Sequence, residues 1–180
     1  KHAVVDGHTI AEGDLLVGLR SNGLHTNGYS LARKIVTEIA GKDYGQRWEG
    51  GETPVGLELL RPHRSYAPVL ELMRDGLVKG CAHITGGGFQ ENIDRMLPSH
   101  CDAVVEASRW KPDPVFSWLQ KTGEVADDDM YRTFNMGVGM VLAVAAGDAE
   151  RVIGHRAVAA YEPRIVGEVV SGSGTVRMVF

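Results

Sequence analysis

Residues 15–35 have the sequence LLVGLRSNGLHTNGYSLARKI, in which a short apolar run passes through a glycine- and amide-rich turn into a segment with apolar residues at helical spacing. A short apolar run bounded by turn residues is typical of a buried strand. Apolar side chains three and four positions apart, ended by Gly41, are typical of a helix. The stretch therefore predicts a central strand over residues 14–19 and a helix over residues 29–40.

The same order recurs over residues 78–97, where an apolar run enters the turn Thr85-Gly86-Gly87-Gly88 and a helix follows. The first N–H groups of a helix have no partner inside it, and the helix dipole leaves them partly positive. A junction of strand, glycines and helix is therefore suited to bind phosphate or another oxyanion. Two such junctions, each with a histidine beside the glycines, point to a phosphorylated small molecule as the ligand.

A third segment, RTFNMGVG at residues 132–139, leads into another apolar run and offers the amide of Asn135. Glycines let the backbone approach a ligand, and Asn, Ser and Thr supply neutral hydrogen-bonding groups. His83 and His25 are the candidates for proton transfer, because imidazole titrates near neutral pH. The candidates for substrate or phosphate binding are Ser21, Asn22, Gly23, Thr26, Asn27, Gly28, Thr85, Gly86, Gly87, Gly88, Asn92 and Asn135.

Structural interpretations of the same residues stay open. A helix N-cap needs only one residue of this kind, a triple glycine also occurs at a plain strand–helix corner, and a lone histidine at a strand end is often structural. The triple glycine is neither a P-loop nor a dinucleotide-binding fingerprint, and no GxSxG elbow is present. The seven histidines are dispersed without metal-ligand spacing, so no metal site is expected.

The composition excludes several classes of protein. With 180 residues, 43% of them hydrophobic and 23% charged, the chain fits one ordinary globular domain. A net charge of −4 without a basic stripe argues against a nucleic-acid binder, and no apolar run is long enough for a membrane helix. The two cysteines form no disulfide framework, which fits a cytoplasmic protein.

Further strands and helices follow from the same patterns. We expect a helical tendency over residues 57–75, strands over 78–84, 101–106 and 137–145, and helices over 89–97, 112–122 and 146–161. Residues 164–170 and 175–180 are predicted to form a closing hairpin around the intervening glycines. The acidic run Asp127-Asp128-Asp129 is interpreted as a solvated loop. Strands that alternate with helices give an α/β (α+β layered) domain.

The motifs together resemble the C-terminal domain of the phosphoribosylformylglycinamidine cyclo-ligase family, also called aminoimidazole ribonucleotide synthetases. The matching stretches are residues 13–19, 21–34, 82–98 and 131–140, and the likeness runs from about residue 3 to the end. It implies a three-layer domain with a mixed sheet and helices. It also implies that residues 1–180 form a single C-terminal domain. This agrees with the chain start, KHAVVD, which lacks a signal-peptide core and is interpreted as mid-protein sequence.

The resemblance implies an ATP- and Mg²⁺-dependent enzyme of purine biosynthesis. The family converts formylglycinamidine ribonucleotide to aminoimidazole ribonucleotide, ADP and phosphate. An N-terminal domain that is absent from this chain would carry most of the ATP and Mg²⁺ site, so the fragment alone is expected to be inactive. Its partners would be the phosphoribosyl substrate, its own N-terminal domain and a second copy in a homodimer, with no nucleic acid and no membrane.

Two positions depart from the family pattern. Pro62-His63-Arg64-Ser65-Tyr66 has histidine where the family usually has threonine, and Arg20 replaces a small residue before Ser21. Two alternatives to the cyclo-ligase remain: a non-catalytic nucleotide- or anion-binding module, and another enzyme of the same superfamily, of the selenophosphate synthetase or thiamine-monophosphate kinase type.

Overall fold

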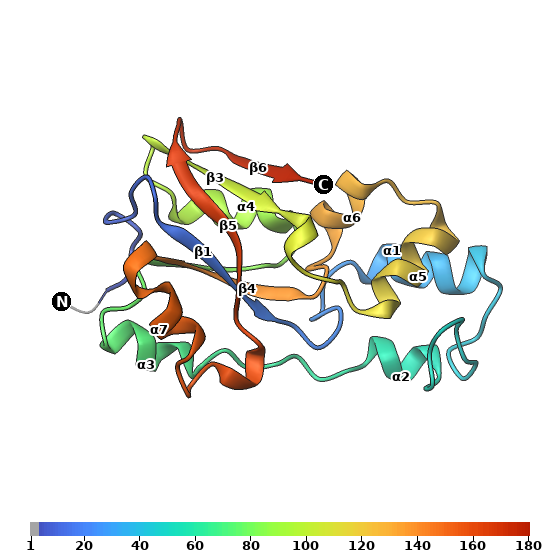
Figure 1. The fold of residues 1–180 in the computed structure, drawn as a ribbon. Helices are drawn as coiled ribbons and strands as arrows, with labels where there is room; N and C mark the ends of the chain where they lie inside the picture. Colours follow the sequence, from blue (N-terminus) through green and yellow to red (C-terminus); the bar gives the residue numbers. More distant parts are fainter. Residues whose placement is uncertain (1–3) are drawn as a thin grey trace.

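The computed structural model describes residues 4–180, so the first three residues of the expected mid-protein start lie outside the described residues. One six-stranded sheet with the order β2-β4-β1-β5-β3-β6 organises the chain (Figure 1). Its strands are β1 Leu15–Arg20, β2 Gly80–His83, β3 Cys101–Glu106, β4 Val138–Val144, β5 Arg164–Ser171 and β6 Val176–Val179. The helices are α1 Tyr29–Lys34, α2 Val55–Leu59, α3 Val69–Arg74, α4 Gly88–Ile93, α5 Pro114–Gly123, α6 Asp127–Thr133 and α7 Ala149–Ile153.

The sheet is mixed, as predicted, because β3 pairs in parallel with β6 while the other pairings are antiparallel. β1 lies inside the sheet between β4 and β5, which confirms the central strand. β1 and β2 both run antiparallel to β4, and Leu19 and His83 pair with Met140 from its two sides. The carboxyl ends of β1 and β2 therefore reach the same end of the sheet, where β4 begins.

Apolar side chains are buried on both faces of the sheet. Successive residues of a strand point to opposite faces. Accordingly, Leu16 joins the core shared with α1, α4, α5 and α6, whereas Val17 joins the core shared with α3 and α7. Figure 1 shows α3 and α7 together on one side of the sheet, away from α1 and α5. This arrangement of helices, sheet and helices confirms the α/β class and the three layers.

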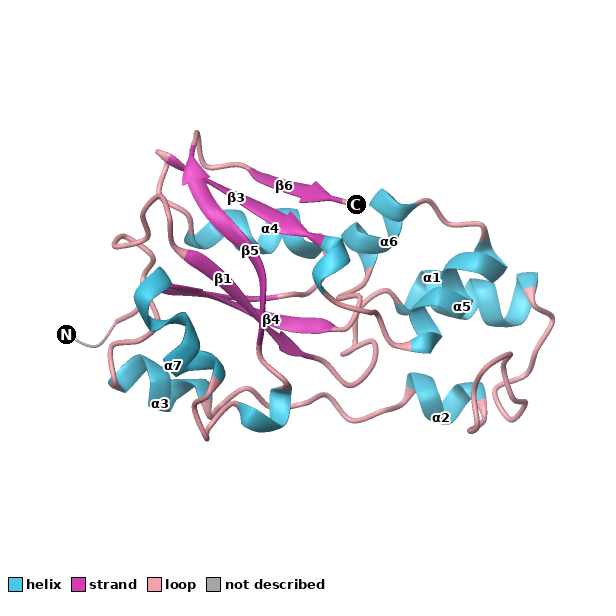
Figure 2. Ribbon diagram, in the orientation of Figure 1, coloured by secondary structure: helices cyan, strands magenta, loops and turns pink. Residues whose placement is uncertain are grey.

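Several helices are shorter than their sequence patterns. α1 continues as a π-helical turn over Ile35–Ile39, and α4 continues as a 3₁₀ turn over Asp94–Met96. The predicted helix over residues 146–161 consists of α7 between two 3₁₀ turns, Ala146–Asp148 and Ala159–Tyr161. An irregular segment separates α2 from α3, and Figure 2 shows it running past the sheet. It brings residues 60–66 to the strand ends discussed below.

The interpretation of Asp127, Asp128 and Asp129 as a loop is wrong. These residues form the first turn of α6, whose buried side chains are Met130 and Tyr131. Negative charge in the first turn is favourable because the N-terminal end of a helix is partly positive. The acidic run therefore starts a helix that packs on the core.

The predicted hairpin of residues 164–170 and 175–180 is also wrong. β5 pairs with one side of β3, and β6 pairs in parallel with the other side. The Asp102 carboxylate of β3 accepts hydrogen bonds from the backbone N–H groups of Ser173, at 2.7 Å, and Thr175, at 2.8 Å. Because Asp102 holds the connection across the end of β3, the chain passes over that strand instead of folding back along β5.

Among residues 4–180, no helix combines the length and the apolar character that crossing a membrane requires.

Candidate functional site

The three segments singled out in the sequence meet at one end of the sheet. The turn after β1 and the turn after β2 touch where the N–H of Gly86 donates to Asn27 Oδ1, at 3.2 Å. The segment before β4 joins them through the N–H of Ser21, which donates to the Gly137 carbonyl at 2.9 Å. We call residues 21–28, 83–88 and 135–137 the glycine-turn site. Its parts are remote in sequence, and the antiparallel pairing of both strands with β4 brings them together.

The turn after β1 has an unusual backbone. His25 and Thr26 have φ of 54° and 66°, a left-handed conformation that non-glycine residues seldom adopt. Asn22 holds the turn through its side chain, which contacts His25 Nε2 with Oδ1 at 2.6 Å and donates to the Pro62 carbonyl at 2.9 Å. Strained backbone of this kind persists only where neighbouring contacts enforce it, and it clusters at functional sites.

Three histidines gather beside this turn. His25 lies in the turn after β1, His83 ends β2, and His63 comes from the segment between α2 and α3. The Nε2 atoms of His63 and His83 are 3.1 Å apart. The rings of His25 and His63 are stacked with their centroids 4.2 Å apart. The hydroxyl of Tyr66 donates to the Arg20 carbonyl at 3.0 Å, which ties the His63 segment to the end of β1.

Burial disfavours the protonated form of two of these imidazoles. It lowers the pKa of His25 to about 3, with further repulsion from His63, His83 and Arg64. Burial and the nearby His63 also lower the pKa of His83. An efficient general acid or base has a pKa near the working pH. His83, which is only partly buried, therefore suits proton transfer better than His25.

The buried polar candidates have partners inside the protein. Asn135 is 1% exposed, and its Oδ1 accepts from the Ser21 hydroxyl and the Gly137 N–H, each at 2.9 Å. Its Nδ2 donates to the Gly23 carbonyl, also at 2.9 Å. Asn135 therefore links β4 to the turn after β1. A direct contact between its amide and a ligand stays a prediction.

The turn after β2 is held in the same manner. Asn92 Nδ2 donates to the Gly88 carbonyl at 2.7 Å, and Asn92 Oδ1 accepts from the Thr85 hydroxyl at 3.0 Å. Gly88 has φ of 64°, and a Cβ there would lie 1.9 Å from the Tyr131 carbonyl oxygen. Packing thus explains Gly88. Gly86 differs, since a Cβ there would meet no atom within 4 Å. Open space beside Gly86 is compatible with a ligand that lies against the backbone.

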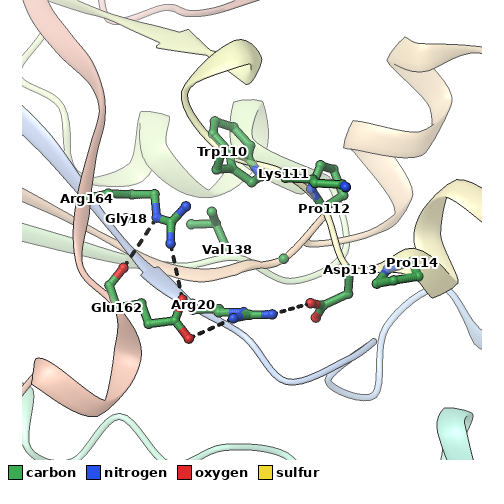
Figure 3. A pocket seen from close by; sticks show the side chains of 11 residues that line it. Gly18, Arg20, Trp110, Lys111, Pro112, Asp113, Pro114, Val138, Glu162 and Arg164 are labelled. Atoms are coloured by element: carbon green, nitrogen blue, oxygen red, sulfur yellow. Dashed lines mark hydrogen bonds and ion pairs between the residues drawn. The ribbon is translucent and has the colours of Figure 1, made fainter.

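A hollow of about 320 Å³ lies beside β1 and the start of β4 (Figure 3). Arg20 bridges Asp113 and Glu162, with each nitrogen–oxygen distance 2.7 Å. Arg164 pairs with Glu162 at 3.3 Å. The two arginines are thus engaged by carboxylates, and Arg20 compensates the charge of Asp113, which is buried. Pairing with carboxylates leaves these two guanidinium groups less able to bind an anion.

The family comparison decides what this domain is. The model of the family "AIR synthase related protein, C-terminal domain" matches residues 11–179. The chain belongs to this family. The match covers β1 to β6 and therefore includes the whole glycine-turn site.

Curated relatives of this family member are phosphoribosylformylglycinamidine cyclo-ligases. The enzyme of Syntrophotalea carbinolica is 42% identical over 172 residues, which cover 95% of this chain and 49% of the relative. The enzyme of Bacillus subtilis is 44% identical over 175 residues, which cover 97% of this chain and 51% of the relative. The chain spans about half the length of these relatives.

Solved structures share the fold at low identity. Thiamine-monophosphate kinase from Stenotrophomonas maltophilia has a TM-score of 0.59 at 16% identity and covers 94% of this chain and 51% of its own. Escherichia coli HypE, a hydrogenase maturation protein, has a TM-score of 0.59 at 20% identity; the match covers 97% of this chain and 48% of HypE. Thermotoga maritima PurL complexed with FGAR has a TM-score of 0.57 at 15% identity; the match covers 100% of this chain and 27% of PurL. At these identities the likeness shows the fold alone.

The sequence did not identify every residue near the site. It singled out His25 and His83, whereas His63 was noted only as a departure from the family pattern. The prediction that the histidines are dispersed holds along the chain but not in space, where three come together. The string Pro62-His63-Arg64-Ser65-Tyr66 was the available signal. No local pattern indicated that it would lie against the ends of β1 and β2.

Proposed function

We propose that the full-length protein is the ATP-dependent cyclo-ligase that converts formylglycinamidine ribonucleotide to aminoimidazole ribonucleotide, ADP and phosphate in purine biosynthesis. This chain would be its C-terminal domain. The structural observation on which this proposal rests is that both glycine turns meet at one end of the sheet. Identity of 42–44% to named cyclo-ligases over nearly the whole chain supports the assignment.

The glycine-turn site would bind the phosphoribosyl part of the substrate. The N–H groups at the starts of α1 and α4 suit a phosphate because they lack partners inside their helices. The side chains of Asn22, Thr26 and Asn27 hold the strained turn, and Thr26 and Asn27 would contact the ribose by exchanging their bonds to the His25 carbonyl. Ser21, Asn92 and Asn135 would keep the two turns in position for these contacts.

The reaction needs positioning and charge stabilisation more than covalent chemistry from the protein. ATP would phosphorylate the formamide oxygen, and a substrate nitrogen would then attack the activated carbon and expel phosphate. Holding the nitrogen near that carbon removes much of the entropic cost of ring closure. His83 would take the proton released by the attacking nitrogen, and neutral His25 would orient the substrate.

ATP and Mg²⁺ would be held mainly outside this chain. Mg²⁺ prefers oxygen ligands, usually carboxylates and phosphates. Among residues 4–180, the sole grouping of three or more His, Cys, Asp or Glu side chains suited to a metal consists of histidines. The residues present therefore do not fit Mg²⁺. We propose that an N-terminal domain supplies that site, that the full-length protein is a homodimer, and that it works in the cytoplasm.

The first experiment measures the activity of the full-length protein. We expect it to form aminoimidazole ribonucleotide and one ADP for each formylglycinamidine ribonucleotide consumed. Turnover of selenide or thiamine monophosphate without turnover of this substrate would assign it to another enzyme of the superfamily. Binding of nucleotide without turnover of any of the three would indicate a non-catalytic module.

The second experiment tests the location of the substrate site with Gly86→Ala. The added methyl meets no protein atom, so the fold should be unaffected, but it narrows the space beside the backbone. We expect a KM increase of about tenfold or more, equivalent to about 1.4 kcal/mol, at unchanged melting temperature. Gly147→Ala is the matched control, because a Cβ there also meets no atom within 4 Å. Equal KM values for the two variants would place the substrate elsewhere.

The third experiment tests proton transfer with His83→Asn in the full-length enzyme. We expect kcat/KM to fall by about 10²–10⁴-fold if His83 acts as a general base. Near-normal kinetics with a lower melting temperature would make His83 a structural residue.

A further inference from the structure

Three imidazoles from separate parts of the chain lie within reach of one ion. One ring nitrogen from each of His25, His63 and His83 can be chosen so that all three lie within 4.8 Å of one another. We propose that these histidines form a binding site for a divalent transition metal of the Zn²⁺ class. The proposal rests on the geometry of this cluster and does not depend on the proposed cyclo-ligase activity; a bound metal ion would occupy His83 and compete with its proposed role as a base.

The donor set selects the kind of metal. Neutral imidazole nitrogen is a ligand for Zn²⁺, Cu²⁺, Ni²⁺ and Co²⁺, whereas Mg²⁺ and Ca²⁺ require oxygen. The cluster contains three imidazoles and neither a carboxylate nor a thiolate. Three histidines with one open position are also the protein ligands of catalytic zinc in carbonic anhydrase. The site would therefore be distinct in chemistry from any Mg²⁺–ATP site.

His25 is arranged as a metal ligand would be. Its Nε2 lies 2.6 Å from Asn22 Oδ1 and 3.2 Å from the backbone nitrogen of Asn22, so Asn22 occupies this ring nitrogen. The other ring nitrogen, Nδ1, is buried without a hydrogen-bond partner in a residue that is 2% exposed. In the tautomer that fits the shorter contact, Nε2–H donates to Asn22 Oδ1 and the lone pair of Nδ1 is free to bind a metal ion. Ligating histidines characteristically donate their other ring N–H to an oxygen acceptor, which fixes the tautomer. An unpartnered buried nitrogen is costly unless something binds it.

The distances are close to those that coordination requires. With zinc–nitrogen bonds of about 2.0–2.1 Å, two ligands on a tetrahedral ion lie about 3.3 Å apart. His63 and His83 already have their Nε2 atoms 3.1 Å apart. His63 is the exposed member, and its ring is stacked on His25. It is therefore the ligand that would turn to point its lone pair at the ion.

The fourth position would face a substantial space. His63 and His83 line an open hollow of about 520 Å³ whose other lining residues include Tyr66, Met73 and Met140. Water or one atom of a small ligand would complete the coordination from that side. Arg64 opposes the cation, since its charge acts on His25. Its Nη1 donates to the carbonyls of Arg20 and Ala160, each at 3.3 Å. We therefore expect affinity in the micromolar range, weaker than that of structural zinc.

The test uses Co²⁺ as a spectroscopic probe on the full-length protein without an affinity tag, in excess Mg²⁺ to occupy oxygen-ligand sites. We expect one Co²⁺ per chain with the intense visible bands of a four-coordinate ion, displaced by Zn²⁺. His63→Ala should weaken binding by about 10–100-fold and abolish those bands. His63 is exposed, so this variant should fold, and equal melting temperatures of metal-free wild type and variant verify it. His100→Ala, also exposed, is the matched control and should bind as the wild type does.

Two results would overturn the proposal. One is Co²⁺ binding with equal affinity and only weak six-coordinate bands in wild type and His63→Ala. The other is the absence of any binding at millimolar Co²⁺, which would leave His63 and His83 as a hydrogen-bonded pair. Because the readout is metal binding, a failure of the cyclo-ligase assay would not affect it.

Discussion

Replacing Asn135 with alanine should remove the hydrogen bonds that link β4 to the turn after β1 and so lower the stability of the domain. The substitution removes three hydrogen bonds of 2.9 Å each, made with the Ser21 hydroxyl, the Gly23 carbonyl and the Gly137 N–H. Because Asn135 is only 1% exposed, water cannot readily replace the lost amide. A buried polar group left without a partner costs about 1–3 kcal/mol.

The expected loss of stability depends on which of the three former partners of Asn135 can form new hydrogen bonds. The Ser21 hydroxyl can rotate, whereas the two backbone groups are held by the chain. Two backbone groups left without partners give a loss of about 2–6 kcal/mol in the free energy of unfolding. That is a large part of the roughly 5–15 kcal/mol that stabilises a typical domain.

The assay is urea unfolding at neutral pH, followed by circular dichroism. Asn27→Ala is the matched control, because Asn27 also makes side-chain bonds to the backbone, to Gly86 and His25, but is partly exposed. We expect it to cost less than about 1 kcal/mol, since water can replace a solvated partner. Equal losses for the two variants would refute the reasoning. An unchanged stability of Asn135→Ala with a raised substrate KM would instead make the amide a direct ligand.

Other predictions concern the glycines and β3. Gly88→Ala should lower the free energy of unfolding by more than about 2 kcal/mol, because the residue has positive φ and its Cβ would meet the Tyr131 carbonyl. Gly86→Ala should change it by no more than about 0.5 kcal/mol, because a Cβ there meets no atom. Thermal melts that give the two variants the same stability would contradict the packing argument. Backbone hydrogen bonds lower the pKa of Asp102 below 3.8, so its charge stabilises the fold above about pH 4, and this contribution is lost as the pH falls through the lowered pKa. Asp102→Asn should therefore be less stable at pH 7, with a difference from wild type that shrinks below pH 4; a constant difference across pH would show that the charge contributes nothing.

Local patterns in the sequence determined the strands and the glycine turns. β1, β3 and β4 were predicted nearly to the residue, because short apolar runs between turn residues have few other ways to be buried. Gly28 and Gly87, which have positive φ and precede α1 and α4, were likewise recognisable as turn residues. The family motifs lie in these same segments, which is why they could be recognised without a structure.

Tertiary structure decided which of these segments meet. The order of the sheet depends on how both faces are covered, a property of the whole chain that no window of sequence contains. It placed both glycine turns at one end, turned the expected hairpin into strands on opposite sides of β3, and brought His63 to within 3.1 Å of His83. Asp102 shows the physical reason, since its two hydrogen bonds to residues more than 70 positions away direct the last strand to its place. Such contacts form only once the sheet has assembled, so the histidine cluster and the course of β6 belong to the tertiary structure alone.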